Sequence, residues 1–306
     1  MTKTSVFTGK KIRSFFLLIT ALALAPVIAY STHIVGGELN YKCLGGNKYE
    51  IHLRVYRDCY TGVPPFDANA SIGIFNSSNV RVATLSIPYP GKTVLYPTIA
   101  QADVCVKIPS NVCVEVCEYV GTIVLPPIAG GYQLAYQRCC RNPTISNITN
   151  PGNTGATYYA HIPDQAVACN SNPVFKNWPP IFVCVGNPIL FDHSATDEDG
   201  DSIVYNLCTP LNGATASVPM PQPPNTPPYT AITWRAPYGA TDPLGGIPLS
   251  IDPRTGSLTG TPNTIGQFVV GVCADEYRNG VLISTTKRDF QFNVIKCLPS
   301  IVVAAP

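Results

Sequence analysis

The sequence is poor in charge and in helix-forming pattern. Only 12% of its 306 residues are Asp, Glu, Lys or Arg, and the formal net charge is +2. A chain this close to neutral lacks the charge excess that attracts nucleic acid, so no nucleic-acid partner is expected. No amphipathic helix of useful length is visible either, whereas Pro (30) and Gly (24) are abundant. This composition indicates an all-β protein of short strands joined by tight turns.

A long apolar run occurs only near the amino end. Three basic residues within positions 10–13 precede an apolar run over residues 15–28, and Ala29 and Ser31 supply small residues at positions −3 and −1 of a cleavage site. We interpret residues 1–31 as a secretory signal peptide. The alternative, an uncleaved anchor helix, requires a longer apolar run. The mature chain is therefore expected to lack a membrane span, to depend on secretion machinery and to be secreted or at the cell surface.

Cysteine, by contrast, is plentiful. Twelve cysteines, an even number, in an exported chain predict disulfide bonds. The alternative is a four-thiolate zinc site, which would need Cys113 and Cys117 to meet the pair Cys139-Cys140 in space. Seven cysteines precede residue 165 and five follow it, so one bridge is expected to cross this position, with Cys169 as the natural candidate. The disulfide candidates are Cys43, Cys59, Cys105, Cys113, Cys117, Cys139, Cys140, Cys169, Cys184, Cys208, Cys273 and Cys297.

The stretch Ile34-Val35-Gly36-Gly37 looks like the new amino terminus of an activated chymotrypsin-like protease. Such an enzyme needs a His base, an Asp that orients it and a Ser nucleophile. No histidine lies in an Ala-Ala-His-Cys context, and Gly-Asp-Ser-Gly-Gly does not occur. Asp192-His193-Ser194 contains the three residue types, but neighbouring residues on a strand point to opposite faces and cannot form a relay. We therefore expect a first strand with a bulge or bend at Gly-Gly, no catalytic residues and no enzyme activity.

Alternating apolar and polar residues predict strands on both sides of a Pro- and Asn-rich stretch. In residues 49–59, for example, Tyr49, Ile51, Leu53 and Val55 fall on one face. We predict two antiparallel immunoglobulin- or cadherin-like β-sandwiches in tandem, at residues 32–165 and 181–298, with a linker at 166–180 and a tail at 299–306. The other predicted strands lie at residues 70–75, 80–87, 112–125, 131–140, 156–162, 181–191, 202–208, 231–236, 266–274 and 288–297.

One acidic motif indicates a metal site. In SATDEDGDSIVYNL (194–207), Asp197, Asp199 and Asp201 fall at alternate positions, with a glycine that permits a tight turn. Carboxylates so spaced in a loop can converge on a hard cation, and calcium takes six to eight oxygen ligands in flexible geometry. Asp275 in CADEYRNG is a candidate ligand from a second loop, and so is Asp192. The alternative is a solvated acidic turn. A structural calcium ion is the expected cofactor.

The same motif, followed by LSIDPRTGSLTGTPNTIGQFVVGVCADEYRNG, resembles a cadherin-like domain of the dystroglycan or immunoglobulin-like type over about residues 181–297. The resemblance implies a β-sandwich of the kind found in adhesins and other surface proteins, which often bind calcium. It carries the acidic positions over to Asp197, Asp199, Asp201 and Asp275. The cysteines of this half depart from the family pattern and imply added bridges, Cys208–Cys273 between facing strands and Cys184–Cys297.

The first half resembles a second group of proteins. HIVGGELNYKCLGGNKYEIHLRVYRDC and GYQLAYQRCCRN resemble the start of large secreted proteins of gliding Bacteroidetes. Those chains continue into repeated PKD-type sandwiches and end in a gliding-motility-associated sorting domain used by type IX secretion. This sequence stops at KCLPSIVVAAP without such a domain. The resemblance thus implies either a fragment of a longer protein or another export route.

The features together predict a non-catalytic, secreted or cell-surface adhesion or structural module. It is expected to be the amino-terminal part of a larger adhesin for gliding or surface attachment, with a surface polysaccharide or a protein as partner. The alternative is a carbohydrate-binding protein of the cell surface, which predicts coplanar exposed aromatic rings with polar side chains beside them.

Overall fold

The computed structural model describes residues 34–62, 64–95, 112–164, 167 and 169–297. The predicted signal peptide, the tail at 299–306 and Cys105 lie outside these residues. Within them the fold is all-β, as predicted: no α-helix occurs in the described ranges, and a single 3₁₀ turn is formed by η1 (Pro151–Asn153). The expected fold class is therefore confirmed at the level of several antiparallel sheets.

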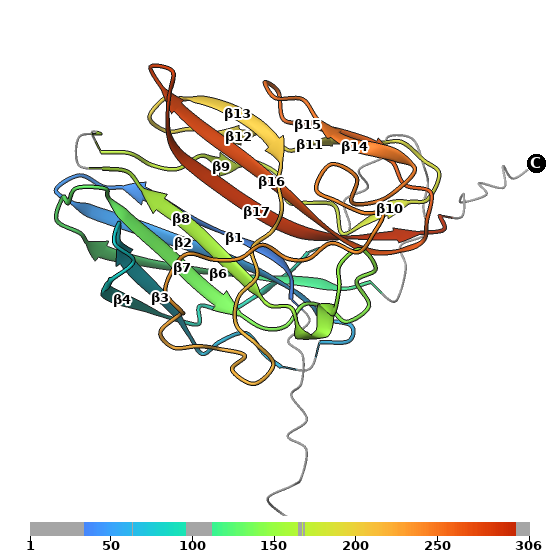
Figure 1. Cartoon of the computed structure of the whole chain (residues 1–306), viewed down its shortest axis with the longest axis horizontal. Helices are drawn as coiled ribbons and strands as arrows, with labels where there is room; N and C mark the ends of the chain where they lie inside the picture. The colour runs from blue at the N-terminus through green and yellow to red at the C-terminus, as the bar shows by residue number, and fades with distance from the viewer. Residues whose placement is uncertain (1–33, 63, 96–111, 165–166, 168, 298–306) are drawn as a thin grey trace, which may run out of the picture. The chain divides into compact units, whose positions relative to one another are not determined.

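The largest sheet has eight strands and draws on both halves of the chain. Its order is β13-β16-β17-β1-β2-β6-β5, with β10 paired in parallel to β17 (Figure 1). These strands are β1 (Ile34–Cys43), β2 (Lys48–Asp58), β5 (Thr93–Leu95), β6 (Val114–Val124), β10 (Phe182–Cys184), β13 (Ser202–Leu207), β16 (Gly266–Arg278) and β17 (Val281–Ile295).

The remaining strands form smaller sheets. One has four strands in the order β4-β3-β7-β8, a second has three in the order β11-β15-β14, and β9 pairs with β12. Their bounds are β3 (Asn69–Asn76), β4 (Arg81–Pro88), β7 (Tyr132–Arg138), β8 (Ala156–Ile162), β9 (Val174–Phe175), β11 (Ile189–Asp192), β12 (Ala195–Thr196), β14 (Ile247–Ile251) and β15 (Ser257–Thr261).

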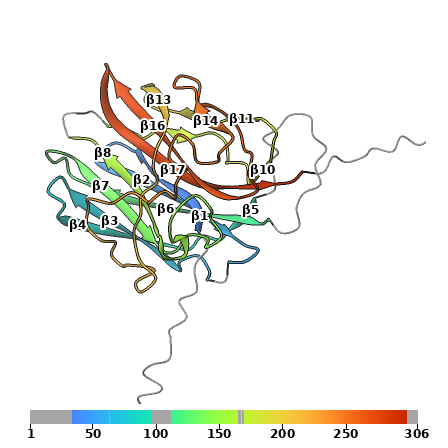
Figure 2. The same cartoon turned by 45° about the vertical axis from the view of Figure 1, so that its right-hand side comes forward.

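Strand β1 pairs with β2 on one side and with β17 on the other. The register places Gly36 opposite Phe290 and Glu38 opposite Arg288, and the blue β1 and red β17 lie side by side in both views (Figure 1, Figure 2). One hydrogen-bonded sheet thus runs from the first predicted domain into the second. Two separate sandwiches in tandem are not confirmed, and the boundaries at 165 and 181 stay a prediction.

Hydrophobic residues gather in two main clusters. The first joins β1, β2 and β6 to the four-stranded sheet and includes Leu39, Leu53, Ile74 and Leu134, each 0% exposed. The face predicted for residues 49–59 is confirmed, because Tyr49, Ile51, Leu53 and Val55 all pack in this cluster. The second cluster lies around β16 and β17 and contains Phe268, Val270, Leu258, Leu249 and Phe292.

The bulge predicted at the Gly-Gly pair of β1 lies just before the pair, at Val35. The register with β2 shifts between Ile34 and Gly36, which marks the bulge. A Cβ atom at Gly36 would lie 2.2 Å from the carbonyl oxygen of Asp289, and one at Gly37 would lie 2.5 Å from that of Arg54. Only glycine permits this close approach of three backbones, so the stretch that resembles a protease terminus is a structural requirement of the sheet.

One strand prediction was wrong. Residues 231–236 form only isolated bridges, from Ala231 to Leu211 and from Trp234 to Ile148. The apolar residues of this segment have another role. Ile232 is buried in a small cluster with Ile148, and Trp234 packs against the edge of that cluster. Segment 181–191, predicted as one strand, is divided into β10 and β11 at Gly186, whose φ of 77° is in the left-handed region.

His193 follows β11 and is enclosed by aromatic rings. Its ring centroid lies 4.9 Å from that of Phe175, 5.3 Å from Phe191 and 5.2 Å from Phe290. Neither ring nitrogen has a hydrogen-bond partner, and the residue is 0% exposed, so Asp192-His193-Ser194 is not arranged as a proton relay. Burial, and secondarily the charge of Arg288, hold the pKa of His193 well below its usual value.

Replacing His193 with Phe is expected to reduce the acid sensitivity of the fold. Because the folded pKa of His193 is depressed, the unfolded chain takes up this proton first, and stability is lost as the pH falls below about 6.5. In H193F the slope of the unfolding free energy against pH should be flatter by up to about 1.4 kcal/mol per pH unit in this acidic range. Urea unfolding of the wild-type protein and H193F at a series of pH values from about 4 to 7 measures the two slopes. Equal slopes for the two proteins would contradict the prediction.

Candidate metal centre

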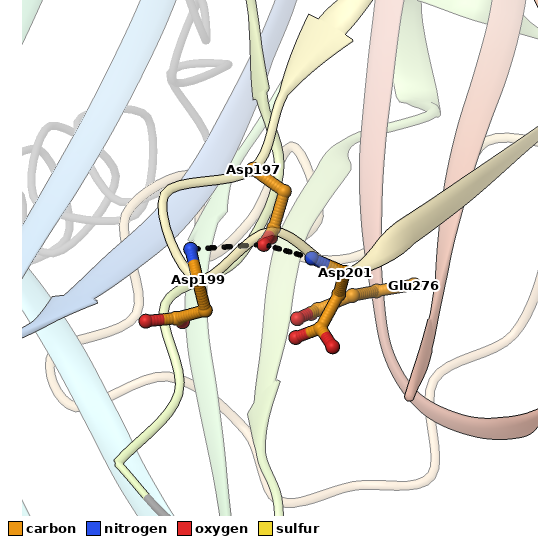
Figure 3. A group of neighbouring side chains, drawn as sticks. All are labelled: Asp197, Asp199, Asp201 and Glu276. Atoms are coloured by element: carbon orange, nitrogen blue, oxygen red, sulfur yellow. Dashed lines mark hydrogen bonds between the residues drawn. The ribbon is translucent and has the colours of Figure 1, made fainter. Parts of the chain in front are cut away.

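The acidic loop joins β12 to β13 and is organised by its own first carboxylate. Asp197 Oδ1 accepts hydrogen bonds from the backbone N–H groups of Asp199, at 3.0 Å, and Asp201, at 2.8 Å (Figure 3). Gly200, between them, has a φ of 83°, a conformation that glycine adopts without strain. The alternation of Asp in the sequence thus produces a tight turn that holds three carboxylates together.

A fourth carboxylate comes from β16. Ligand oxygens of Asp197, Asp199, Asp201 and Glu276 all lie within 4.8 Å of one another (Figure 3). We call these four residues the acidic cluster. Glu276 is 0% exposed, whereas Asp199 is at the surface, so the cluster extends from the sheet to the solvent.

Asp275, the fourth ligand predicted from the sequence, is not in this cluster. It precedes Glu276 on β16, and neighbouring strand residues point to opposite faces. Its carboxylate instead accepts hydrogen bonds from Asn206, at 2.6 Å, and from the hydroxyl of Thr285, at 2.7 Å. Asp192, the other candidate, accepts a hydrogen bond from the N–H of Ser194 at 2.9 Å and is also outside the cluster.

Polar groups around the acidic cluster satisfy only some of its oxygens. Arg278 Nε donates to Asp201 at 2.9 Å, and Asn170 Nδ2 donates to Glu276 Oε2 at 3.1 Å. The N–H of Ser171 donates to Asp199 at 2.6 Å. Asp197 Oδ2 and Glu276 Oε1 are buried and have no hydrogen-bond partner.

Burial dominates the electrostatics at Glu276. It raises the pKa of this carboxyl to about 8, although hydrogen bonds from Ser284 and Asn170 act in the opposite direction. Burial also raises the pKa of Asp197, whereas the hydrogen bond from Arg278 lowers that of Asp201. A carboxyl group in such a place is stable either with a proton or beside a cation. One guanidinium among four carboxylates leaves negative charge for a divalent ion, and the all-oxygen ligand set suits a hard cation such as calcium.

Five disulfides occur among the described residues. Cys43–Cys169 is the bridge expected to cross residue 165, and Cys208–Cys273 and Cys184–Cys297 are the pairs implied by the cadherin-like resemblance. Cys59–Cys113 and the adjacent pair Cys139–Cys140 complete the set.

The disulfides also decide two sequence predictions. Three of the four thiols considered for a zinc site are oxidised, so that alternative is excluded. Cys117, predicted as a disulfide candidate, is instead buried and free, and burial raises the pKa of its thiol to about 11. Several disulfides in one chain indicate an oxidising, extracellular environment. In the part of the chain that the structure describes, no helix is long and apolar enough to cross a membrane.

Comparisons of this chain with protein-family models, with curated proteins and with solved structures found no match. The resemblances to cadherin-like domains and to gliding Bacteroidetes proteins therefore stay predictions.

Proposed function

We propose that this protein is a non-catalytic adhesion or structural module of the cell surface, and that a calcium ion bound by the acidic cluster stiffens it. The observation that carries the proposal is Glu276, a fully buried carboxyl group that lies beside three aspartates and whose Oε1 accepts no hydrogen bond. Without a cation this group keeps its proton near neutral pH, because its pKa is raised to about 8, and a cation coordinated there would replace the proton.

The position of the cluster supports a mechanical role. An ion there would connect three segments that are far apart in the sequence: the loop of residues 197–201, strand β16 and residues 170–171. The last segment already contacts the cluster through Asn170 and Ser171. Together with five disulfides, such a cross-link restricts the unfolding and fluctuation of the sheet, as an adhesive surface protein requires. By the resemblance of its first half, we place the chain at the start of a larger adhesin.

Calcium is expected to raise the melting temperature. With an affinity in the extracellular range, a Kd of about 10⁻⁴–10⁻³ M, calcium at about 10 mM would add about 1.4–2.7 kcal/mol to the free energy of unfolding. Calorimetric melting of the full chain with calcium, with magnesium and with a chelator measures this effect.

Two matched variants locate the effect. Glu276→Gln removes one ligand but resembles the protonated carboxyl, so the protein should fold in chelator and lose most of the calcium response. Asp275→Asn changes the neighbouring carboxylate on the opposite face and should keep that response. Equal melting temperatures in calcium and chelator, or a response lost in D275N but kept in E276Q, would show that the acidic cluster is only a turn.

A further inference from the structure

A cavity of about 500 Å³ lies beside the acidic cluster. Its floor is the polar face of β1 and β2, where Asn40 is paired with His52 and Lys42 with Glu50. The wall of the cavity is formed by residues within 171–174 and by residues 196–198. The volume is within the roughly 300–1,000 Å³ typical of sites for small ligands, and far above the space needed by one water molecule.

The charges around the cavity already compensate one another. Lys42 pairs with Glu198 at 2.7 Å. His52 Nε2 lies 3.0 Å from Glu50, and His52 Nδ1 lies 3.0 Å from Glu118, a residue outside the lining. The carboxylate of Glu118, followed by that of Glu50, raises the pKa of His52. Arg54 is paired as well, with Glu38 and with Glu118, at 3.1 Å each. Because each basic side chain of the lining already has a carboxylate partner, an anion would have to break an ion pair and a cation would have to compete for a carboxylate, so a neutral ligand is favoured.

Three lining residues have a buried polar atom without a hydrogen bond, and one of them, Arg54, is held in ion pairs with Glu38 and Glu118. Asn40 is 2% exposed and its Nδ2 has no acceptor, and Asp197 Oδ2 has no donor. One residue is on the sheet and the other on the loop. A hydroxyl group suits either atom, because its oxygen can accept from an amide and its hydrogen can be donated to a carboxylate.

The lining offers little to an apolar ligand. The ring of Tyr41 is packed in the first hydrophobic cluster, which leaves the half-exposed Val174 as the apolar side chain available to a ligand. A peptide or lipid would find no pocket for apolar anchors. The aromatic platform expected of a carbohydrate-binding protein is also missing among the described lining residues, so recognition has to come from hydrogen bonds.

We propose that this cavity binds one or two units of a neutral glycan through its hydroxyl groups. The inference extends the proposed adhesive function to a class of partner, but it does not depend on a bound cation. Because Asp197 belongs to both sites, binding is measured in chelator, where no cation competes for its carboxyl group. A failure of the calcium experiment therefore leaves this proposal standing, and the reverse also holds.

The test is titration calorimetry on the full chain at about pH 6 with sugars that differ in charge alone. Glucose, galactose and N-acetylglucosamine and their β-linked dimers are the neutral probes, glucosamine is the cation and glucuronate the anion. At least one neutral sugar should bind with a Kd of about 1 mM or tighter, and the charged probes at least about tenfold more weakly. No heat from any neutral sugar at about 50 mM, or equal binding of the charged probes, would overturn the proposal.

Two variants test the assignment of residues. Asn40→Leu has a similar shape and removes an unpartnered amide, so the melting temperature should not fall while sugar affinity drops about tenfold. The matched change Asn263→Leu, at an exposed position outside the cavity lining, should leave affinity unchanged. Glu198→Gln at the exposed rim releases Lys42 and should strengthen glucuronate binding about fivefold or more. Unchanged sugar affinity in N40L or unchanged glucuronate affinity in E198Q would contradict the site.

Discussion

Replacing Glu38 with Gln is expected to lower the free energy of unfolding by about 3–5 kcal/mol. Glu38 on β1 is 0% exposed and accepts hydrogen bonds from Arg288 of β17, at 2.6 and 2.8 Å. Arg54 of β2 donates to the same carboxylate at 3.1 Å. Arg288 is itself 1% exposed, so a neutral residue at position 38 would leave a buried guanidinium without its counter-charge. Urea unfolding of the full chain measures the loss.

The same substitution at Glu50 is the control. Glu50 is on β2, half-exposed, and forms an ion pair with His52, so E50Q should change stability by at most about 1 kcal/mol. Equal losses in the two variants would contradict a special role for the buried carboxylate.

The contribution of Glu38 should also depend on pH. Burial opposes ionisation of Glu38, but Arg288 and then Arg54 outweigh it and hold its pKa below the usual value. The ion pair therefore stabilises the fold above about pH 4.5, and this stabilisation is lost as the pH falls through the lowered pKa. The difference in the free energy of unfolding between the wild-type protein and E38Q should therefore become smaller as the pH falls below about 4.5.

Removing the Cys43–Cys169 bridge, by replacing both residues with Ala, is expected to lower the free energy of unfolding by about 2–4 kcal/mol. The bridge joins residues 126 positions apart, so it restricts a long loop of the unfolded chain. It also fixes the backbone just before Asn170 and Ser171, which contact the acidic cluster. We therefore expect this variant to lose part of its calcium response as well.

The Cys184–Cys297 pair provides the comparison. It spans a similar 113 positions, so its replacement by Ala should cost a similar amount of stability and leave the calcium response intact. Urea unfolding of both variants, with calcium and with chelator, separates the two effects. If both variants lose the calcium response alike, the local role assigned to Cys43–Cys169 is wrong.

Local patterns were the parts of the fold that the sequence predicted well. Residues 49–59 alternate because β2 has one face in a core and one face toward polar groups, and this is visible without any tertiary information. The acidic turn was equally visible, since Asp197 binds backbone groups only two and four residues away. Both features are determined within a few residues of chain.

Other features that depend on distant partners, unlike the bridges Cys43–Cys169, Cys208–Cys273 and Cys184–Cys297, were missed. Asp275 and Glu276 are equally acidic neighbours, and only the pairing of β16 decides which one faces the loop. Asn170 and Asn172 were assigned to a linker because the segment is polar, yet they are 2% and 1% exposed. Their amides are satisfied by bonds to Glu276 and to the backbone of Tyr41, partners more than 100 positions away.

The placement of β1 beside β17 also sets the order in which the sheet can form. Glu38 and Arg288 are 250 positions apart, so the central pairing of the largest sheet is among the least local in the chain. Long-range pairings of this kind slow folding, because the intervening loop must close before the contact forms. At about 5–20 residues per second of synthesis, β17 follows β1 after about 10–50 s. During that time one edge of β1 has no partner and the carboxylate of Glu38 stays hydrated. The two halves of the largest sheet therefore cannot join until β17 has been synthesised.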